Sequence, residues 1–299
     1  MRAAATMPAM ATLTAAAPSL CVSVVVYHSD LARLEETLSA LLVAVQKARE
    51  AAALTTVAVL IVDNSVCRVY HQALHDTIGQ LPWERTEVVC RVLQAAANLG
   101  YGAGHNMALE QGASDCHLVL NPDIVTDSRA LAVGLRYLRE HPQVVLVCPR
   151  GELADGSPAY LSKRMPSVLV LALRAFAPPW LQARFAARLA AYAMHDVHAA
   201  GRPSAVPLAS GCFMLVRGAV LRRVGGFDPA FFLYFEDYDL SLRLAGLGDL
   251  HYLPEMRVRH YGGGNGTQGP AACCLFSASG LAFLPPLRVA LAVAPCENC

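Results

Sequence analysis

The chain has little charge and almost no lysine. Only 16% of its 299 residues are charged and 55% are hydrophobic, which excludes an extensively disordered or low-complexity protein. Its 24 basic residues nearly balance its 23 acidic ones, and lysine occurs only at Lys47 and Lys163. Because the net charge is +1, no general argument for binding nucleic acid remains, and we expect no nucleic-acid partner.

The chain also lacks a convincing membrane span and a disulfide framework. The uncharged stretch 3–27 is mostly Ala and Thr, and the apolar stretch 271–284 is shorter than the roughly 20 residues that cross a bilayer. Many of the ten cysteines lie in or beside apolar runs, where a free thiol acts as a small hydrophobic group, and Cys296 and Cys299 form a C-x-x-C without a second pair. We therefore predict a protein of a reducing compartment, located in the cytoplasm.

Apolar runs alternate with helical patterns through the first half of the chain. The runs with the length and composition of buried strands are 21–27, 57–62, 88–93 and 117–120. Such strands alternating with helices predict an α/β fold, with a mostly parallel, Rossmann-like central sheet and helices on both faces. In sheets of this kind ligands bind beyond the carboxyl ends of the strands, where this chain has Tyr27, His28, Asp63 and Asp123.

The second half of the chain is less regular. Helices are expected at 128–140 and 236–245, and strands at 144–148 and 212–216. The apolar segment 165–194 is interrupted by Pro178-Pro179 and carries arginine but no acid; its arginines are Arg174, Arg184 and Arg188. This segment is either a helical hairpin packed on the domain or a surface that lies on anionic lipid at the inner membrane.

Two motifs with candidate chemistry lie in the first half. Residues 98–106 read NLGYGAGHN, and closely spaced glycines between a strand and a helix permit positive φ angles and close approach of an anion. Their spacing does not fit the dinucleotide fingerprint. Residues 120–123 read LNPD, and a carboxylate just beyond a buried strand suits a divalent cation. Taken alone, each motif is also typical of an ordinary turn.

A third motif, residues 225–240, contains the carboxylates Glu236, Asp237 and Asp239 within four residues. Acids in the first turn of a helix are favoured by its dipole, so capping is one explanation. Asp237, however, lies one turn before the apolar stripe of this helix and on the same side, so it should point inward, whereas Asp239 can pair with Arg243. An inward carboxylate beside aromatic residues is a candidate general base.

In this order, the motifs resemble those of the inverting glycosyltransferases of family 2, which have the GT-A fold, and above all their bacterial rhamnosyltransferase-like branch. The resemblance implies transfer of a sugar, in the first instance L-rhamnose from dTDP-L-rhamnose, from a nucleoside-diphosphate donor to a glycan or lipid-linked glycan. Such enzymes assemble envelope polysaccharides such as the lipopolysaccharide O-antigen. The domain organisation expected from the resemblance is a disordered tail at 1–19, a single GT-A domain at 20–265 with a nucleotide-sugar half (20–125) and an acceptor half (126–265), and an atypical tail at 266–299.

The resemblance also assigns roles to residues. Asp237 would be the catalytic base, and Asp123 and His260 would hold a divalent cation, Mg²⁺ or Mn²⁺. Nucleotide-sugar contacts are expected from Tyr27, His28, Asp63, Asn98, Gly100, Asn106 and Asn121. Acceptor contacts are expected from Glu236, Asp239, Asp228 and Tyr234. This sequence departs from the family at Asn121, which stands at the first position of the Asp-x-Asp metal motif.

Two other functions fit parts of the pattern. A nucleotidyltransferase would share the nucleotide-binding half and a metal carboxylate, but it would need a glycine-rich loop with Arg or Lys after the first strand, where residues 27–30 read YHSD. A non-catalytic carbohydrate-binding protein would tolerate the loss of Asp123 and Asp237, and both are present. Assaying a panel of sugar nucleotides for metal-stimulated release of nucleoside diphosphate separates the three functions.

Overall fold

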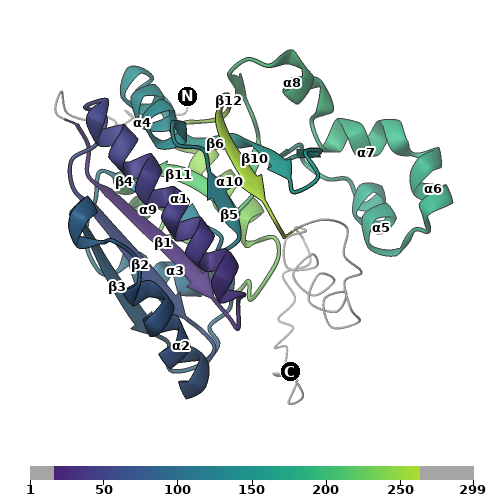
Figure 1. Ribbon diagram of the computed structural model, residues 1–299. Coiled ribbons are helices and arrows are strands. Elements are labelled where there is room, and N and C mark those ends of the chain that lie inside the picture. Colours follow the sequence, from purple (N-terminus) through teal and green to yellow (C-terminus); the bar gives the residue numbers. More distant parts are fainter. Residues whose placement is uncertain (1–16, 263–299) are drawn as a thin grey trace, which may run out of the picture.

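The computed structural model describes residues 17–262, so the expected tails lie outside the described residues except for 17–19. Its centre is a ten-stranded sheet with the order β3-β2-β1-β4-β11-β6-β12-β5, in which β7 pairs with β6 and β9 with β12 (Figure 1). The strands are β1 (Leu20–Val26), β2 (Val57–Asp63), β3 (Val88–Gln94), β4 (Cys116–Leu120), β5 (Ile124–Thr126), β6 (Val144–Leu153), β7 (Pro158–Ala159), β9 (Ser204–Ala205), β11 (Phe213–Arg217) and β12 (Asp249–His260). The short strands β8 (Ser162–Lys163) and β10 (Leu208–Ala209) form a separate pair.

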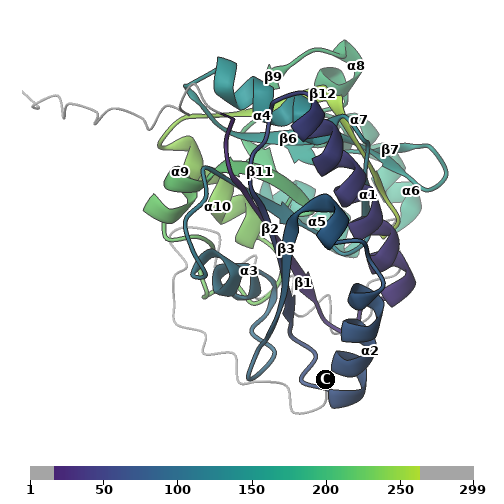
Figure 2. The same cartoon turned by 60° about the vertical axis from the view of Figure 1, so that its left-hand side comes forward.

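Helices cover both faces of the sheet, as predicted (Figures 1 and 2). The helices are α1 (Leu31–Glu50), α2 (Arg68–Gly79), a 3₁₀ helix (Glu84–Thr86), α3 (Tyr101–Leu109), α4 (Ala130–Glu140), α5 (Val168–Phe176), α6 (Pro179–Arg184), α7 (Ala186–Tyr192), α8 (His195–Ala200), α9 (Gly218–Arg223) and α10 (Glu236–Ala245). The helices α1, α2 and α4 lie on one face, and α3, α9 and α10 lie on the other. The predicted mixed α/β architecture is confirmed.

The first four strands form a continuous parallel part of the sheet, and β6 and β12 form a second parallel pair. Strand β1 pairs in parallel with both β2 and β4, and β2 pairs in parallel with β3. The apolar, β-branched runs of β1, β2 and β4 are almost wholly buried, because helices cover them from both sides, whereas β3 at the edge of the sheet is partly exposed. Strand β11 then enters antiparallel between β4 and β6, which brings a late part of the chain to the centre of the sheet.

Helix α1 shows how the local sequence determines one layer. Its N-cap is Asp30, whose carboxylate accepts hydrogen bonds from the amides of Ala32 and Arg33 over 3.0 and 3.3 Å. Leucines at helical spacing then turn one face of the helix toward the sheet, and this buried set includes Leu34, Leu38, Leu41 and Leu42. The cap also leaves Asp30 and Arg33 at the carboxyl edge of the sheet, where they line a pocket.

A buried polar cluster fixes α3 against the sheet. The hydroxyl oxygen of Ser23 lies 2.7 Å from Nδ1 of His105 on α3 and 2.8 Å from Nε2 of His117 on β4. Burial lowers the pKa of His105 well below its ordinary value and lowers that of His117 to about 4, so both rings are neutral at physiological pH. The position of the glycine-rich segment that opens α3 is thereby tied to the core.

The segment 165–194 projects from the sheet as three short helices, α5, α6 and α7, whereas the sequence suggested a hairpin with one break (Figure 1). Pro179 is the first residue of α6, where a missing amide proton costs nothing. Large apolar side chains on these helices face solvent: Val168 is 66%, Phe176 70% and Trp180 71% exposed. None of the helices within residues 17–262 is both long and apolar enough to cross a membrane.

Candidate active site

The carboxyl end of β4 and the amino end of β11 meet at one edge of the sheet. Because these strands are antiparallel, the residues that follow β4 lie beside those that precede β11. The amide of Asn121 donates to the carbonyl of Cys212 over 2.9 Å. Tyr101, the first residue of α3, places its hydroxyl oxygen 2.9 Å from Oδ1 of Asn121 and 2.7 Å from the carbonyl oxygen of Gly211. Segments from both halves of the chain therefore converge on this edge.

Asp123 faces His260 just beyond this junction. Oδ2 of Asp123 lies 3.3 Å from Nε2 of His260, since β12 runs antiparallel to β5 and brings its last residue opposite Ile124. Burial alone would raise the pKa of Asp123, but the hydrogen bond and charge of His260, together with the backbone of Gly262, hold it below its ordinary value. Oδ1 of Asp123 is buried and has no hydrogen-bond partner within the described part of the chain. The structure thus brings together the two residues expected to hold a metal.

An open pocket of about 450 Å³ lies beside Asp123. Its lining consists of Ser29, Asp30, Arg33, Asn121, Pro122, Asp123, Tyr261 and Gly262. The guanidinium carbon of Arg33 lies 5.1 Å from the centre of the Tyr261 ring, and the Tyr261 hydroxyl donates to Glu36 over 2.9 Å. The pocket combines oxygen ligands for a hard cation with a guanidinium group, a set that suits an anionic, metal-bound ligand.

The residues expected to contact the nucleotide base lie at different depths. Asp63 is fully buried, and its Oδ1 accepts from the amide and hydroxyl of Ser65 over 2.9 and 2.5 Å. Its Oδ2 lies 2.8 Å from Nδ1 of His71. Tyr27 and His28 are exposed, and their ring centres are 5.0 Å apart. Nucleotide contact remains a prediction for Tyr27, His28 and Asp63.

The start of the glycine-rich segment packs against the loop that precedes α10. Gly100 has a φ angle of 81°, and a Cβ atom there would lie 2.3 Å from the carbonyl oxygen of Phe232, so this position requires glycine. The same carbonyl accepts a hydrogen bond from the amide of Tyr101 over 3.0 Å. The side chain of Asn98 accepts from the amide of Gly100 over 3.1 Å. The predicted donor loop and the predicted acceptor loop are therefore in direct contact.

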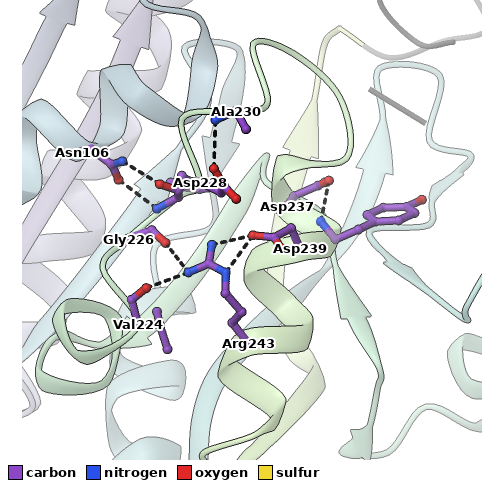
Figure 3. Close-up of polar contacts among 10 residues, drawn as sticks. Asn106, Val224, Gly226, Asp228, Ala230, Asp237, Asp239 and Arg243 are labelled. Carbon is purple, nitrogen blue, oxygen red and sulfur yellow. Dashed lines mark hydrogen bonds and ion pairs between the residues drawn. The ribbon is translucent and has the colours of Figure 1, made fainter. Parts of the chain in front are cut away.

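Asn106 binds the backbone of the acceptor half. Its Oδ1 accepts from the amide of Phe227 over 2.9 Å and its Nδ2 donates to the carbonyl of Phe227 over 2.8 Å, a pair of bonds visible in Figure 3. These two bonds hold Asn106 against the turn at Gly226. An added Cβ atom at Gly226 would lie 2.3 Å from Oδ1 of Asn106, so there is no room for a side chain there. Sugar-nucleotide contact by Asn98, Gly100 and Asn106 remains a prediction.

Glu236, which is buried, and Asp237, which is half-buried, open α10 as an acidic pair. The carboxylate of Asp237 turns inward, where Oδ2 accepts from the amide of Gly211 and Oδ1 from the amide of Tyr238, both over 2.9 Å. Burial raises the pKa of Asp237 to about 6, against the effect of these backbone bonds. Burial and the charge of Asp237 raise the pKa of Glu236 to about 8. A fixed carboxylate that titrates near neutral pH is suited to general-base catalysis.

Asp239 is turned away from Asp237, as Figure 3 shows. Oδ2 of Asp239 lies 2.7 Å from both Nε and Nη2 of Arg243, which is the i, i+4 pair expected from the sequence. The same guanidinium group donates to the carbonyls of Val224 and Gly226 over 2.8 and 2.7 Å. Asp239 therefore orients the arginine that holds the turn before α10.

The loop between this turn and α10 carries backbone strain. Tyr234 and Phe235 both have a φ angle of 68°, a conformation that bulky residues rarely adopt and that is concentrated at functional sites. Asp228 organises the start of the loop, since its Oδ1 accepts from the amide of Ala230 over 2.9 Å. Acceptor contact by Asp228, Tyr234, Glu236 and Asp239 remains a prediction.

Several residues at this edge were not among the predicted site residues. Tyr101 lies inside the glycine-rich motif and Tyr261 directly follows His260, so their aromatic hydroxyls could have been found there. Gly211 and Lys163 lie outside the motifs found in the sequence. Lys163 is distinguished only by the scarcity of lysine in this chain. Gly211 acts through its backbone, which no sequence pattern marks.

Comparison with known proteins identifies the family. The model of the family described as "Glycosyltransferase like family 2" matches residues 18–271. The chain belongs to this family. An N-acetylglucosaminyl-diphospho-decaprenol L-rhamnosyltransferase of Mycobacterium tuberculosis is 30% identical over 195 residues, which cover 61% of this chain and 62% of that relative. Rhamnosyltransferase WbbL of Escherichia coli K12 is 51% identical over 53 residues, which cover 17% of this chain and 20% of WbbL.

These matches confirm the predicted family and its rhamnosyltransferase-like branch. The chain spans less than two thirds of the length of each of the two relatives.

Solved structures confirm the GT-A fold of this family 2 chain. A mannosyltransferase of Pyrobaculum calidifontis superposes with a TM-score of 0.55 at 14% identity, covering 91% of this chain and 71% of that one. TarS of S. aureus superposes with a TM-score of 0.52 at 14% identity, covering 81% of this chain and 60% of that one.

The raised pKa of Glu236 predicts a pH-dependent stability. The folded state keeps the proton up to about pH 8, whereas an unfolded glutamate loses it near its ordinary pKa of 4.5, so wild-type stability should fall as pH rises between these values. Glu236→Gln removes this loss. The difference in unfolding free energy between Glu236→Gln and the wild type should therefore grow as pH rises from 4.5 to about 8, by up to about 1.4 kcal/mol per pH unit.

Urea unfolding monitored by circular dichroism, at several pH values within that window, measures this gain. Glu35→Gln, at an exposed carboxylate of α1, is the matched control and should show no comparable trend. A pH-independent difference between wild type and Glu236→Gln would mean that Glu236 is ionised in the folded protein.

Proposed function

We propose that this protein is an inverting glycosyltransferase that moves a sugar from a nucleoside-diphosphate donor to a glycan or lipid-linked glycan acceptor. L-Rhamnose from dTDP-L-rhamnose is the donor group of first choice, since two of the matched relatives are named rhamnosyltransferases. The observation that carries the proposal is the inward carboxylate of Asp237, held by the amide of Gly211 in a chain of this family. Residues 20–125 would bind the donor and residues 126–265 the acceptor.

Asp237 acts as the general base in this proposal. It accepts the proton of an acceptor hydroxyl while that oxygen bonds to the anomeric carbon and the bond to the nucleoside diphosphate breaks. A single displacement from the opposite face inverts the anomeric centre, so no covalent intermediate is required. The backbone amides of Gly211 and Tyr238 orient the carboxylate, and burial keeps its pKa close to neutral, where proton transfer is efficient.

Asp123 and His260 would hold a divalent cation. The donor set fits, because Asp123 offers a buried oxygen without a partner and an imidazole nitrogen lies 3.3 Å from its second oxygen. Within residues 17–262 no group of three or more His, Cys, Asp or Glu side chains is arranged for a metal, so the remaining ligands would come from the donor diphosphate and water. The cation would supply charge neutralisation for the leaving diphosphate. The mannosyltransferase neighbour was solved with GDP-Man and Mn²⁺.

The projecting helices α5–α7 would place the enzyme on the anionic inner-membrane surface. Their exposed apolar side chains, Phe176 and Trp180 among them, stand on a segment that carries arginines and no acid. Apolar residues that enter the lipid interface and arginines that meet anionic headgroups together favour such a surface. A lipid-linked acceptor would then be met at the membrane by a peripheral enzyme on its cytoplasmic face.

Replacing the base tests the mechanism. Asp237→Asn should lower kcat by at least ~100-fold with donor affinity nearly unchanged, because the base acts on the transition state. In the wild type, kcat/KM should rise with pH until the pH exceeds the pKa of Asp237, about 6. Release of nucleoside diphosphate from a panel of sugar nucleotides measures both. Asp155→Asn, in an exposed turn, is the control, and near-normal turnover of Asp237→Asn would contradict the assignment.

Removing the metal ligand tests the cation site. Asp123→Ala should abolish stimulation by Mg²⁺ or Mn²⁺ and weaken donor binding, since one ion would serve both binding and departure of the diphosphate. Calorimetric titration of the donor with and without Mn²⁺ measures the loss, with Asp115→Asn at the opposite edge of the sheet as the control. Wild-type activity that persists in EDTA would contradict the metal site. A side chain such as Arg33 would then stabilise the negative charge of the leaving diphosphate.

Liposome binding tests the membrane surface. Wild-type protein should co-sediment with vesicles that contain phosphatidylglycerol at low salt and less so with pure phosphatidylcholine. The double substitution Phe176→Ser and Trp180→Ser should release most of it, whereas Val69→Ser, at an 80% exposed residue of α2, should not. Wild-type protein that stays in the supernatant would show that α5–α7 serve a structural purpose only.

A further inference from the structure

Lys163, one of two lysines in the chain, lies within electrostatic range of the candidate base. It belongs to β8, which pairs with β10. Strand β10 is anchored on α10, because Oγ of Ser241 lies 3.1 Å from the amide nitrogen of Ala209 and 3.3 Å from its carbonyl oxygen. The chain continues from β10 to Gly211, whose amide binds Asp237. Short paired strands thus hold Lys163 close enough to Asp237 for its charge to oppose the effect of burial on the pKa of that carboxyl.

Lys163 and Arg174 lie against the same aromatic ring. Nζ of Lys163 is 5.8 Å from the centre of the Tyr192 ring and 6.0 Å from that of Tyr160, and the guanidinium carbon of Arg174 is 5.2 Å from the centre of Tyr192. Tyr192 is buried, and its hydroxyl contacts the hydroxyl of Tyr238 on α10. This contact ties the two cations to the helix that carries the base.

In the part of the chain that the structure describes, the two cations have no ion-pair partner, although the more distant charge of Asp237 acts on Lys163. Burial, followed by the charge of Arg174, lowers the pKa of Lys163 to about 8. The surroundings therefore disfavour the charged form of the ammonium group. A bound anion would relieve this repulsion, and lysine and arginine are the side chains that bind phosphate groups. Lys163 is half-buried and Arg174 exposed, so a ligand can reach both.

We propose that Lys163 and Arg174 bind the diphosphate of an acceptor glycan linked to a polyprenyl diphosphate. This assignment rests on the proposed function, in which the acceptor is lipid-linked. The parts of such a molecule would meet the protein in their covalent order: a sugar hydroxyl at Asp237, the diphosphate at the two cations, and the polyprenyl chain along the exposed apolar residues of α5, which carries Arg174 (Figure 1). The donor diphosphate is expected at Asp123, in a pocket that Lys163 and Arg174 do not line.

Binding of farnesyl diphosphate tests the assignment without turnover. Calorimetry in EDTA, with no sugar nucleotide present, should show binding to the wild type that Lys163→Met and Arg174→Met each weaken about tenfold or more, the effect of losing one charged hydrogen-bond donor. Lys163→Arg keeps the charge and should keep most of the affinity. Lys47→Met, which removes the other lysine where it pairs with Glu50 on α1, is the control and should bind as the wild type does. Binding of dTDP with Mg²⁺ should be equal in all these proteins.

Three results would overturn the assignment. In the first, farnesyl diphosphate fails to bind the wild type or binds Lys163→Met as tightly. In the second, Lys163→Met weakens dTDP instead, which would assign the cations to the donor. In the third, Lys163→Met weakens farnesol, which lacks the diphosphate, by the same factor. Charge-dependent binding of farnesyl diphosphate to a protein that transfers no sugar from any nucleotide would support the anion site and overturn the proposed function alone.

Discussion

The antiparallel entry of β11 between β4 and β6 is the constraint on which the candidate site depends. It brings the residues before β11 to the carboxyl edge of the parallel strands, where the amide of Asn121 donates to the carbonyl of Cys212. Gly211 is then fixed between the hydroxyl of Tyr101 and the carboxylate of Asp237. One strand placement therefore joins the candidate metal motif of one half of the chain to the candidate base of the other.

The sequence was most informative where local chemistry decides the structure. Continuous apolar runs predicted the parallel strands, and the spacing of Asp239 and Arg243 predicted an ion pair that depends only on helix geometry. The inward turn of Asp237 followed from the apolar stripe of α10 in the same way. These features need no knowledge of distant partners.

Other features depend on contacts between distant residues and left no local signal. The strand that carries Lys163 is two residues long, too short for a periodic pattern, and its position depends on β10 far along the chain. Asn106 reads as a ligand-loop residue, yet it binds the backbone of Phe227, because tertiary packing determines its partner. The division of segment 165–194 into three helices likewise reflects the packing of these helices against one another as well as the proline break.

The contact between Gly100 and Phe232 has a consequence for how sequences of this family vary. A side chain at position 100 would meet the Phe232 carbonyl at 2.3 Å, and that carbonyl already accepts the amide proton of Tyr101. A chain that carries another residue in place of Gly100 must move the loop before α10, and with it the strained residues that lead to the candidate base, Asp237. Glycine at this position is therefore a marker by which related sequences that keep this loop arrangement can be sorted from those that have replaced it.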